Sequence, residues 1–326
     1  YEVLGIEHLP GAERSPPPER SGLLGAVRHV STLLASASDL NTILDDVLAV
    51  LESDLGIEHA MVMLIDRSHE RLFTVASRGY PASGVGSEIS LGHGVIGVAA
   101  REGTAIRITH GTSEYAYSRT MRERAERHGL AELLETEIPL PGLPTPGSPL
   151  AVPLRVSGCT VGVLFVESPQ EARFSWEDED ALVAIAAQLG TTIVVLQQAA
   201  DASDDVPARA EHVPTPRGAP LVVRHYAADH SVFIGDEYLI KGVAGAIFRK
   251  LVRDFLVEGR TDFTNRELRL DPSIRLPDIT DNLEARLILL ARRLEERCPA
   301  LRIEKTGRGR FRFHVLRPVV LVEIPR

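Results

Sequence analysis

The sequence predicts an α+β fold in two parts, each with its own helices and antiparallel strands. Three observations support this class. The chain has 326 residues, about twice the length of a typical domain. Segments in which apolar residues recur at helical spacing alternate with short runs of β-forming residues. A proline-rich stretch with few large apolar residues, 199–220, is typical of an exposed linker.

These features divide the chain into five segments. We expect a lead-in tail over residues 1–22, a first folded part over 23–198, the linker over 199–220, a second folded part over 221–318 and a C-terminal tail over 319–326.

The composition is that of a folded soluble protein, with 44% hydrophobic and 25% charged residues. We find no apolar run of the ~20 residues that a membrane-spanning helix needs and no secretory signal, so we expect no membrane partner. Two cysteines, Cys159 and Cys298, are too few for a disulfide framework or a cysteine-based zinc site. A cytoplasmic location fits these observations best.

The net charge of −9 conceals an asymmetry between the two parts. Residues 1–218 contain 16 arginines and 30 acidic residues, a net charge of −14, whereas residues 219–326 contain 20 basic and 15 acidic residues, a net charge of +5. A basic module joined to an acidic one favours a polyanionic partner for the basic one. The 33 arginines against three lysines indicate a GC-rich genome, which weakens any argument from arginine content alone.

In the first part, helical spacing predicts two helices between Leu23 and Leu55, with Asp39 as a cap near the break. A long helix is expected from Trp176, after a capping box formed by Ser175 and Asp178. Between them we expect two hairpins that turn at 66–70 and 157–158, a short helix with a further strand in 86–108, and a surface loop at 138–149.

Four blocks of this part occur in the order of the GAF family. They are the opening helices, LGHGVIGVAAREGTAIRI, SPLAVPLRVSGCTVGVLFVES and FSWEDEDALVAIAAQLG. Residues 23–198 therefore resemble a GAF domain. The resemblance implies an antiparallel sheet with helices on one face, a small-molecule pocket on the other and a sensory role.

Motifs of several GAF subfamilies are absent. Cyclic-nucleotide members carry an Asn-Lys-Phe-Asp-Glu constellation, but the first part has no lysine. Bilin attachment needs a cysteine beside a histidine, whereas Cys159 is followed by Thr160. Methionine sulfoxide reductase members need several pocket cysteines, and this part has one. The ligand or cofactor is therefore left unassigned.

Residues 109–137 fall where the roof of the family's pocket varies most. Imidazole binds haem iron or another metal and phenols hydrogen-bond aromatic ligands. The alternative is that these side chains are ordinary surface residues, and we expect no metal site. The candidates for lining a ligand pocket are His110, Tyr115, Tyr117 and His128.

In the second part, residues 221–240 predict a small antiparallel sheet with turns at 228–230 and 235–236. Three helices should follow. The first ends near Gly259, and the second is capped by Thr264 and Glu267. The third has a core stripe of Leu283, Leu287, Leu290 and Leu294, and a basic hairpin pivots on Gly307–Gly309.

This order resembles the winged-helix DNA-binding domain of OmpR/PhoB-type response regulators over residues 219–315. The stretches GDEYLI, LARRLEE and TGRGRFRF carry the match. By that resemblance the third helix enters the major groove and the hairpin contacts the DNA backbone or minor groove. The expected DNA-binding residues are Arg286, Arg292, Arg293, Arg297, Lys305, Arg308 and Arg310.

Together the two resemblances imply a one-component transcriptional regulator, dimeric through the opening and closing helices, that binds duplex DNA and a small molecule. We find no catalytic triad, P-loop or metal helix, so we expect no enzyme. The alternative is a sensory adaptor whose winged helix contacts a protein. The apolar run at 287–290 favours it, and so do Glu284, Glu295 and Glu296, which would repel phosphate.

Overall fold

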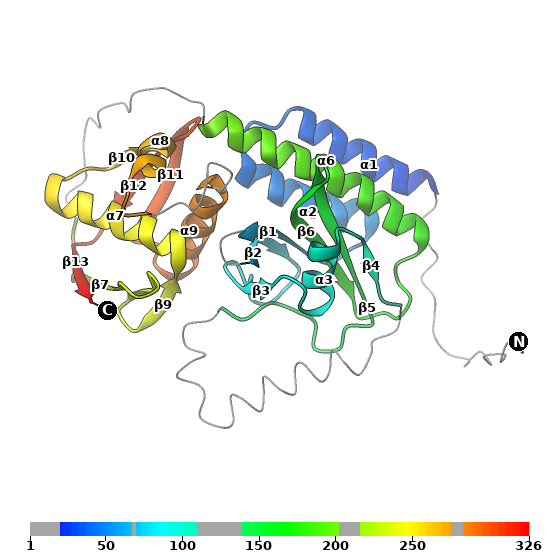
Figure 1. The fold of residues 1–326 in the computed structure, drawn as a ribbon, viewed down its shortest axis with the longest axis horizontal. Helices are drawn as coiled ribbons and strands as arrows, with labels where there is room; N and C mark the ends of the chain where they lie inside the picture. The colour runs from blue at the N-terminus through cyan, green and yellow to red at the C-terminus, as the bar shows by residue number, and fades with distance from the viewer. Residues whose placement is uncertain (1–19, 67–69, 110–137, 202–215, 275–282, 326) are drawn as a thin grey trace, which may run out of the picture.

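The computed structural model describes residues 20–66, 70–109, 138–201, 216–274 and 283–325 (Figure 1). The described residues form one six-stranded sheet in the first part and two smaller sheets in the second.

The sheet of the first part is antiparallel in all its pairings, in the order β3-β2-β1-β6-β5-β4. The two expected hairpins are confirmed, β1 with β2 and β5 with β6. The strand bounds are β1 His59–Asp66, β2 Arg71–Arg78, β3 Glu88–Ser90, β4 Ile106–Arg107, β5 Ser148–Val156 and β6 Cys159–Ser168.

Helices cover both faces of this sheet. One face is covered by α1 (Arg20–Ala35), α2 (Leu40–Leu55) and α6 (Trp176–Asp201). These helices pack against the strand side chains that point to that face, which are every second residue along each strand. On the other, α3 (Gly94–Glu102) packs against a separate cluster that includes Met63 and Phe165.

The expected helix starts are confirmed. The Asp39 side chain accepts the Thr42 N–H at 2.9 Å and caps α2. Ser175 and Asp178 form a reciprocal capping box, with the Ser175 N–H donating to Asp178 Oδ2 at 2.8 Å and the Asp178 N–H donating to Ser175 Oγ at 3.1 Å.

Helix α6 corrects the expectation that no apolar segment is long enough to cross a membrane. Within the described part of the chain, Trp176–Ala200 meets that criterion by length and composition. A core helix of a folded domain meets it too, and Leu182, Ile185, Leu189 and Ile193 of α6 are buried in the core of the first part. The helix is therefore weak evidence for a membrane span.

The second part contains two small sheets with helices between them. A four-stranded sheet has the order β13-β7-β8-β9, and a three-stranded sheet has the order β10-β12-β11. The elements are β7 Leu221–Tyr226, β8 Val232–Ile234, β9 Glu237–Ile240, α7 Gly242–Glu258, β10 Asp262–Thr264, α8 Asn265–Leu270, α9 Leu283–Arg297, β11 Leu301–Gly307, β12 Arg310–Val315 and β13 Val319–Ile324.

Strand β13 corrects the expectation of a C-terminal tail over 319–326. Residues Val319–Ile324 pair in parallel with β7 over its whole length. The segment is rich in β-branched residues, and Val319 is buried while Val320 is exposed, which suits a strand with one covered face. Two other boundaries also shift, because α1 begins at Arg20 and α6 runs through Asp201 into the expected linker.

The two parts are docked on each other, with α9 between them (Figure 1). Buried residues of α1, α2 and α6 belong to the same continuous apolar cluster as those of α7 and α9. Helix α9 contacts α2, β2 and α6 of the first part as well as α7 and β11 of its own. The site considered next lies at this junction.

Candidate functional site

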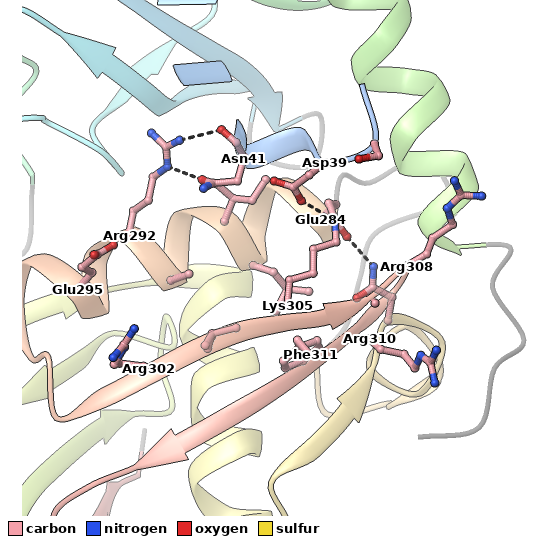
Figure 2. Close-up of a pocket in the computed structure, with 17 residues that line it drawn as sticks. Asp39, Asn41, Glu284, Arg292, Glu295, Arg302, Lys305, Arg308, Arg310 and Phe311 are labelled. Atoms are coloured by element: carbon pink, nitrogen blue, oxygen red, sulfur yellow. Dashed lines mark hydrogen bonds and ion pairs between the residues drawn. The ribbon is translucent and has the colours of Figure 1, made fainter. Parts of the chain in front are cut away.

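A cleft of about 690 Å³ lies between the two parts. Its floor is formed by α9 and the β11–β12 hairpin, and the opposite wall by the loop and first turn that lead into α2, at Ser38, Asp39 and Asn41. Figure 2 shows basic side chains of the second part beside acidic and amide groups of the first.

Helix α9 is buried on nearly every side over its first half. The predicted stripe of Leu283, Leu287, Leu290 and Leu294 is buried. Leu289, from the apolar run, lies against Gly86 of the first part, where an added Cβ would meet its Cδ1 at 3.3 Å. The extra apolar surface of α9 is thus covered by the same chain.

Arg286 makes the most deeply buried polar contact of this junction. Its Nη2 lies 2.6 Å from Oδ2 of Asp66, at the end of β1, and its side chain is only 5% exposed. The guanidinium also lies 4.0 Å from the ring centroid of Phe73 on β2. Arg286 therefore contacts the first part through both charge and aromatic stacking.

Arg292 and Lys305 face the α2 end of the first part. Arg292 donates from Nε to Asn41 Oδ1 at 2.8 Å and from Nη2 to Asp45 Oδ1 at 2.7 Å. Lys305 donates from Nζ to Asp39 Oδ1 at 2.8 Å and pairs with Glu284 of α9. Both contacts border the cleft.

The charges at this end of the cleft shift one another's pKa values. Burial opposes the charged form of Asp39, but the Lys305 hydrogen bond and the Thr42 N–H outweigh it and lower the pKa of Asp39. Burial also opposes the charged form of Lys305, yet the nearby charge of Glu284 and the bond to Asp39 raise the pKa of Lys305. Both groups are held ionised.

Arg293 turns toward its own part. It is 3% exposed and donates to the Leu239 carbonyl at 3.1 Å and the Tyr238 carbonyl at 3.4 Å, next to Glu296. Burial lowers the pKa of Arg293. Arg297, one turn further, is half exposed and lies 4.0 Å from Glu237.

The hairpin side chains lie at the open end of the cleft. Arg308, at the hairpin tip, is exposed, and Arg310 is half-buried; both line the cleft. The seven expected DNA-binding residues therefore separate into three groups: Arg286, Arg292 and Lys305 contact the first part, Arg293 and Arg297 lie beside β9, and Arg308 and Arg310 are at the hairpin.

The sequence does not identify the residues of the first part that contact these basic side chains. The sequence predicts only a capping role for Asp39 and only a turn position for Asp66, and it predicts no role for Asn41, Asp45 or Phe73. The charge asymmetry of the chain was the one signal that pointed toward them, because it predicted an anionic partner for the second part without saying where that partner lies.

The four candidate ligand-pocket residues, His110, Tyr115, Tyr117 and His128, lie outside the described residues. Within the described ranges, no group of three or more His, Cys, Asp or Glu side chains is placed to hold a metal ion.

One buried acid stands on the sheet face that the resemblance assigns to a pocket. Glu167 on β6 accepts the Leu143 N–H at 2.9 Å, and burial raises the pKa of its carboxyl group. It faces the same side as Phe165 and lies opposite His59 of β1 in the strand register.

These features define an α+β protein whose N-terminal sheet domain is docked on a basic C-terminal part. Residues 37–194 match the family model of the GAF domain. The chain therefore contains a GAF domain, a domain type that points to signal sensing and small-molecule binding. Among curated proteins, none matches this chain.

Solved structures similar to this chain include GAF domains and enzymes. The GAF domain of a phosphoenolpyruvate-protein phosphotransferase from Acinetobacter is 24% identical, with 52% of this chain and 90% of that chain covered and a TM-score of 0.40. The corresponding domain from Coxiella burnetii is 18% identical, with 55% and 97% covered and a TM-score of 0.41. Free methionine-R-sulfoxide reductase from Neisseria meningitidis is 19% identical, with 58% and 95% covered and a TM-score of 0.42.

Proposed function

We propose that this protein is a cytoplasmic, signal-responsive regulator of transcription in which the GAF domain controls a winged-helix DNA-binding domain. One observation carries the proposal: a helix and a hairpin rich in basic side chains lie side by side and are held against the acidic edge of the GAF domain. Exposure of the basic surface then depends on the state of the GAF domain.

The order of elements in the second part supports the DNA-binding role. Helix α9 is followed directly by the β11–β12 hairpin, and β10 pairs with β12 to complete a small sheet. In winged-helix domains the third helix enters the major groove and the hairpin contacts the backbone. Arg308, exposed at the hairpin tip, takes the backbone contact in this proposal.

The sensory half of the proposal assigns a small-molecule ligand to the GAF domain, on the sheet face opposite α1, α2 and α6. His110, Tyr115, Tyr117 and His128 remain the proposed ligand contacts. A homodimer through α1 and α6 fits the exposed Leu24 and Val195 on these helices, which are 73% and 55% accessible. No catalytic activity is assigned.

Fluorescence anisotropy with a pool of random duplex DNA tests the DNA-binding role. We expect the full chain to bind, more weakly at physiological than at low salt, because several arginine and lysine contacts release counterions. Arg308→Ala should weaken binding and reduce its salt dependence. The matched control is Arg155→Ala, an exposed arginine at a hairpin turn of the GAF domain. Absence of binding at low salt, both by the folded full chain and by a folded Asp45→Lys variant that lacks the ion pair to Arg292, would contradict the proposal.

A second candidate function, a sensory adaptor without DNA binding, is favoured by the burial of Arg286. A recognition helix that already stacks on Phe73 and pairs with Asp66 is engaged in a protein contact. An adaptor would give flat anisotropy at every salt concentration, even in an Asp45→Lys variant that lacks the ion pair between Asp45 and Arg292 and is less tightly docked.

A further inference from the structure

We propose that the contact between α9 and the GAF domain is autoinhibitory, with Asp39, Asp45 and Asp66 taking the places of DNA phosphates against the basic side chains of the second part. This inference rests on the proposed function, and it states how that function is regulated. We call the docked arrangement of the two parts the closed form and the undocked arrangement the open form. Docking and DNA binding then use the same basic side chains and exclude each other.

The polarity of the interface supports this role. Among the described residues, four ion pairs join the two parts, and in each the acid belongs to the GAF domain and the base to the second part. A carboxylate, like a phosphate, is an anionic oxygen acceptor for the charged groups of arginine and lysine. The pairs are Asp39 with Lys305, Asp45 with Arg292, Asp66 with Arg286 and Glu88 with Lys241.

The positions of the GAF-domain carboxylates also support an autoinhibitory role. At the α2 end of the GAF domain, Asp39 pairs with Lys305 of the hairpin and Asp45 pairs with Arg292 of α9, and Asp66 approaches α9 from the end of β1. The anionic groups thus contact both the helix and the hairpin, the two elements that contact DNA in a winged helix. DNA cannot enter while the α2 end of the GAF domain occupies this side.

The interface also has the character of a reversible contact. Asp45 remains 56% exposed and its partner Arg292 lines the cleft, so this pair can exchange with water or with another anion. The centre, around Arg286, Phe73 and Leu289, is closely packed. A polar rim around a small buried centre is typical of domain contacts that open and close.

Thermodynamic linkage relates the docking of the two parts to the affinity for DNA. If DNA binds only the open form, any change that destabilises closure raises DNA affinity by the same factor, up to the point where the protein is fully open. A signal that activates the protein must favour the open arrangement.

The test uses the full chain with a dye on the exposed Cys159 and a second dye on a cysteine introduced by Glu258→Cys at the end of α7; the remaining cysteine, Cys298, is buried. Asp45→Lys replaces an attraction to Arg292 by a repulsion. Asp180→Lys makes the same charge change at an exposed position of α6 with no ion pair in the described structure, and serves as the control. Energy transfer and affinity for random duplex DNA are measured for each.

We expect Asp45→Lys to lower the transfer efficiency and to raise DNA affinity about tenfold relative to Asp180→Lys, the factor that corresponds to loss of one favourable pair and gain of a repulsion. Equal affinity and equal transfer for the two variants would overturn the autoinhibitory contact and leave the proposed function standing. Lowered transfer with no DNA binding by any variant would overturn DNA binding itself, and autoinhibition of it as well.

Discussion

Arg286 on α9 and Asp66 at the end of β1 form a 2.6 Å ion pair, although they lie in different parts of the chain. Both side chains are almost fully buried, and Phe73 closes one face of the guanidinium. The residue that the sequence predicted would face DNA is therefore a principal link between the GAF domain and the second part. The predictions below follow from this docking and from two polar clusters that support the second part.

Arg286→Ala should weaken the docking of the two parts by about 3 kcal/mol, because it leaves the Asp66 carboxylate without its charge partner at a closely packed interface. Urea titration followed by energy transfer between the parts would show separation at a lower urea concentration. Arg302→Ala, at an exposed position of β11, is the control and should leave the midpoint unchanged. A midpoint that Arg286→Ala does not move would contradict the importance of this pair.

Gly86→Val should also open the junction. Gly86 has φ of +90°, and a Cβ there would lie 2.7 Å from Ile138 Cδ1 and 3.3 Å from Leu289 Cδ1. A β-branched residue meets both backbone strain and a clash with α9. We expect Gly86→Val to lower the stability of the docked protein by roughly 1–3 kcal/mol and to reduce the energy transfer between dyes on the two parts. Gly94→Val is the control: Gly94 has φ of +60° and open space around its Cβ position, so valine there causes backbone strain without a clash.

Lys250→Ala should destabilise the second part by about 3 kcal/mol. Lys250 is buried and pairs with Asp254 at 2.8 Å and with Asp271 at 2.7 Å, which ties α7 to the end of α8. Without the ammonium group, two carboxylates remain close together with no counter-charge. Thermal unfolding measures the effect, and Arg253→Ala, on the exposed side of α7, should cost less than about 0.5 kcal/mol.

The Asp271 carboxyl group makes the stability of the second part depend on pH below about pH 4. Burial opposes its ionisation, but hydrogen bonds from Lys250 and Ser273 lower the pKa of Asp271 to about 2. Because the folded pKa lies below the unfolded one, this stabilisation is present above pH 4 and is lost as the pH falls toward 2. Asp271→Asn should flatten that part of the stability profile measured by chemical unfolding.

His225 predicts a second pH dependence in a higher range. Burial, together with the charges of Arg249 and His230, lowers the pKa of His225 to about 4, against the opposing charges of Glu323 and Asp229. The unfolded chain therefore binds a proton near pH 6.5 that the folded one does not, so stability falls as the pH drops from 6.5 to 4.

We expect this single group to cost about 2 kcal/mol between pH 7 and pH 5. Chemical unfolding at the two pH values measures it, and His225→Asn should remove most of the difference. His314→Asn, on the hairpin and paired with Glu304, is the comparison at a more accessible site. An unchanged pH slope in His225→Asn would show that the imidazole is not the group responsible.

Local features of the fold could be predicted from the sequence because they depend on neighbours in the chain. The Asp39 cap, the Ser175–Asp178 capping box and the hairpin at Gly307–Gly309 all involve residues within a few positions of one another. The order of sheet, helix, short helix, helix and hairpin in the second part also agrees with the pattern of apolar residues.

The candidate site could not be predicted in the same way. The spacing of Arg286 and Arg293 shows that they share a helix face, but it does not say whether solvent, DNA or protein covers that face. The covering group, Asp66 with Phe73, comes from a hairpin far away in the sequence. Strand β13 was missed for a similar reason, since its partner β7 lies at the other end of the second part.

The most direct measurement is a titration of the doubly labelled Glu258→Cys chain, which carries no other change, with random duplex DNA at low salt. Energy transfer between the dyes at Cys159 and at position 258 is followed alongside anisotropy. If closure and DNA binding exclude each other, transfer should fall along the same curve as DNA binds. DNA bound to saturation with transfer unchanged would contradict the proposal, because it would mean that DNA binds while α9 stays docked on the GAF domain.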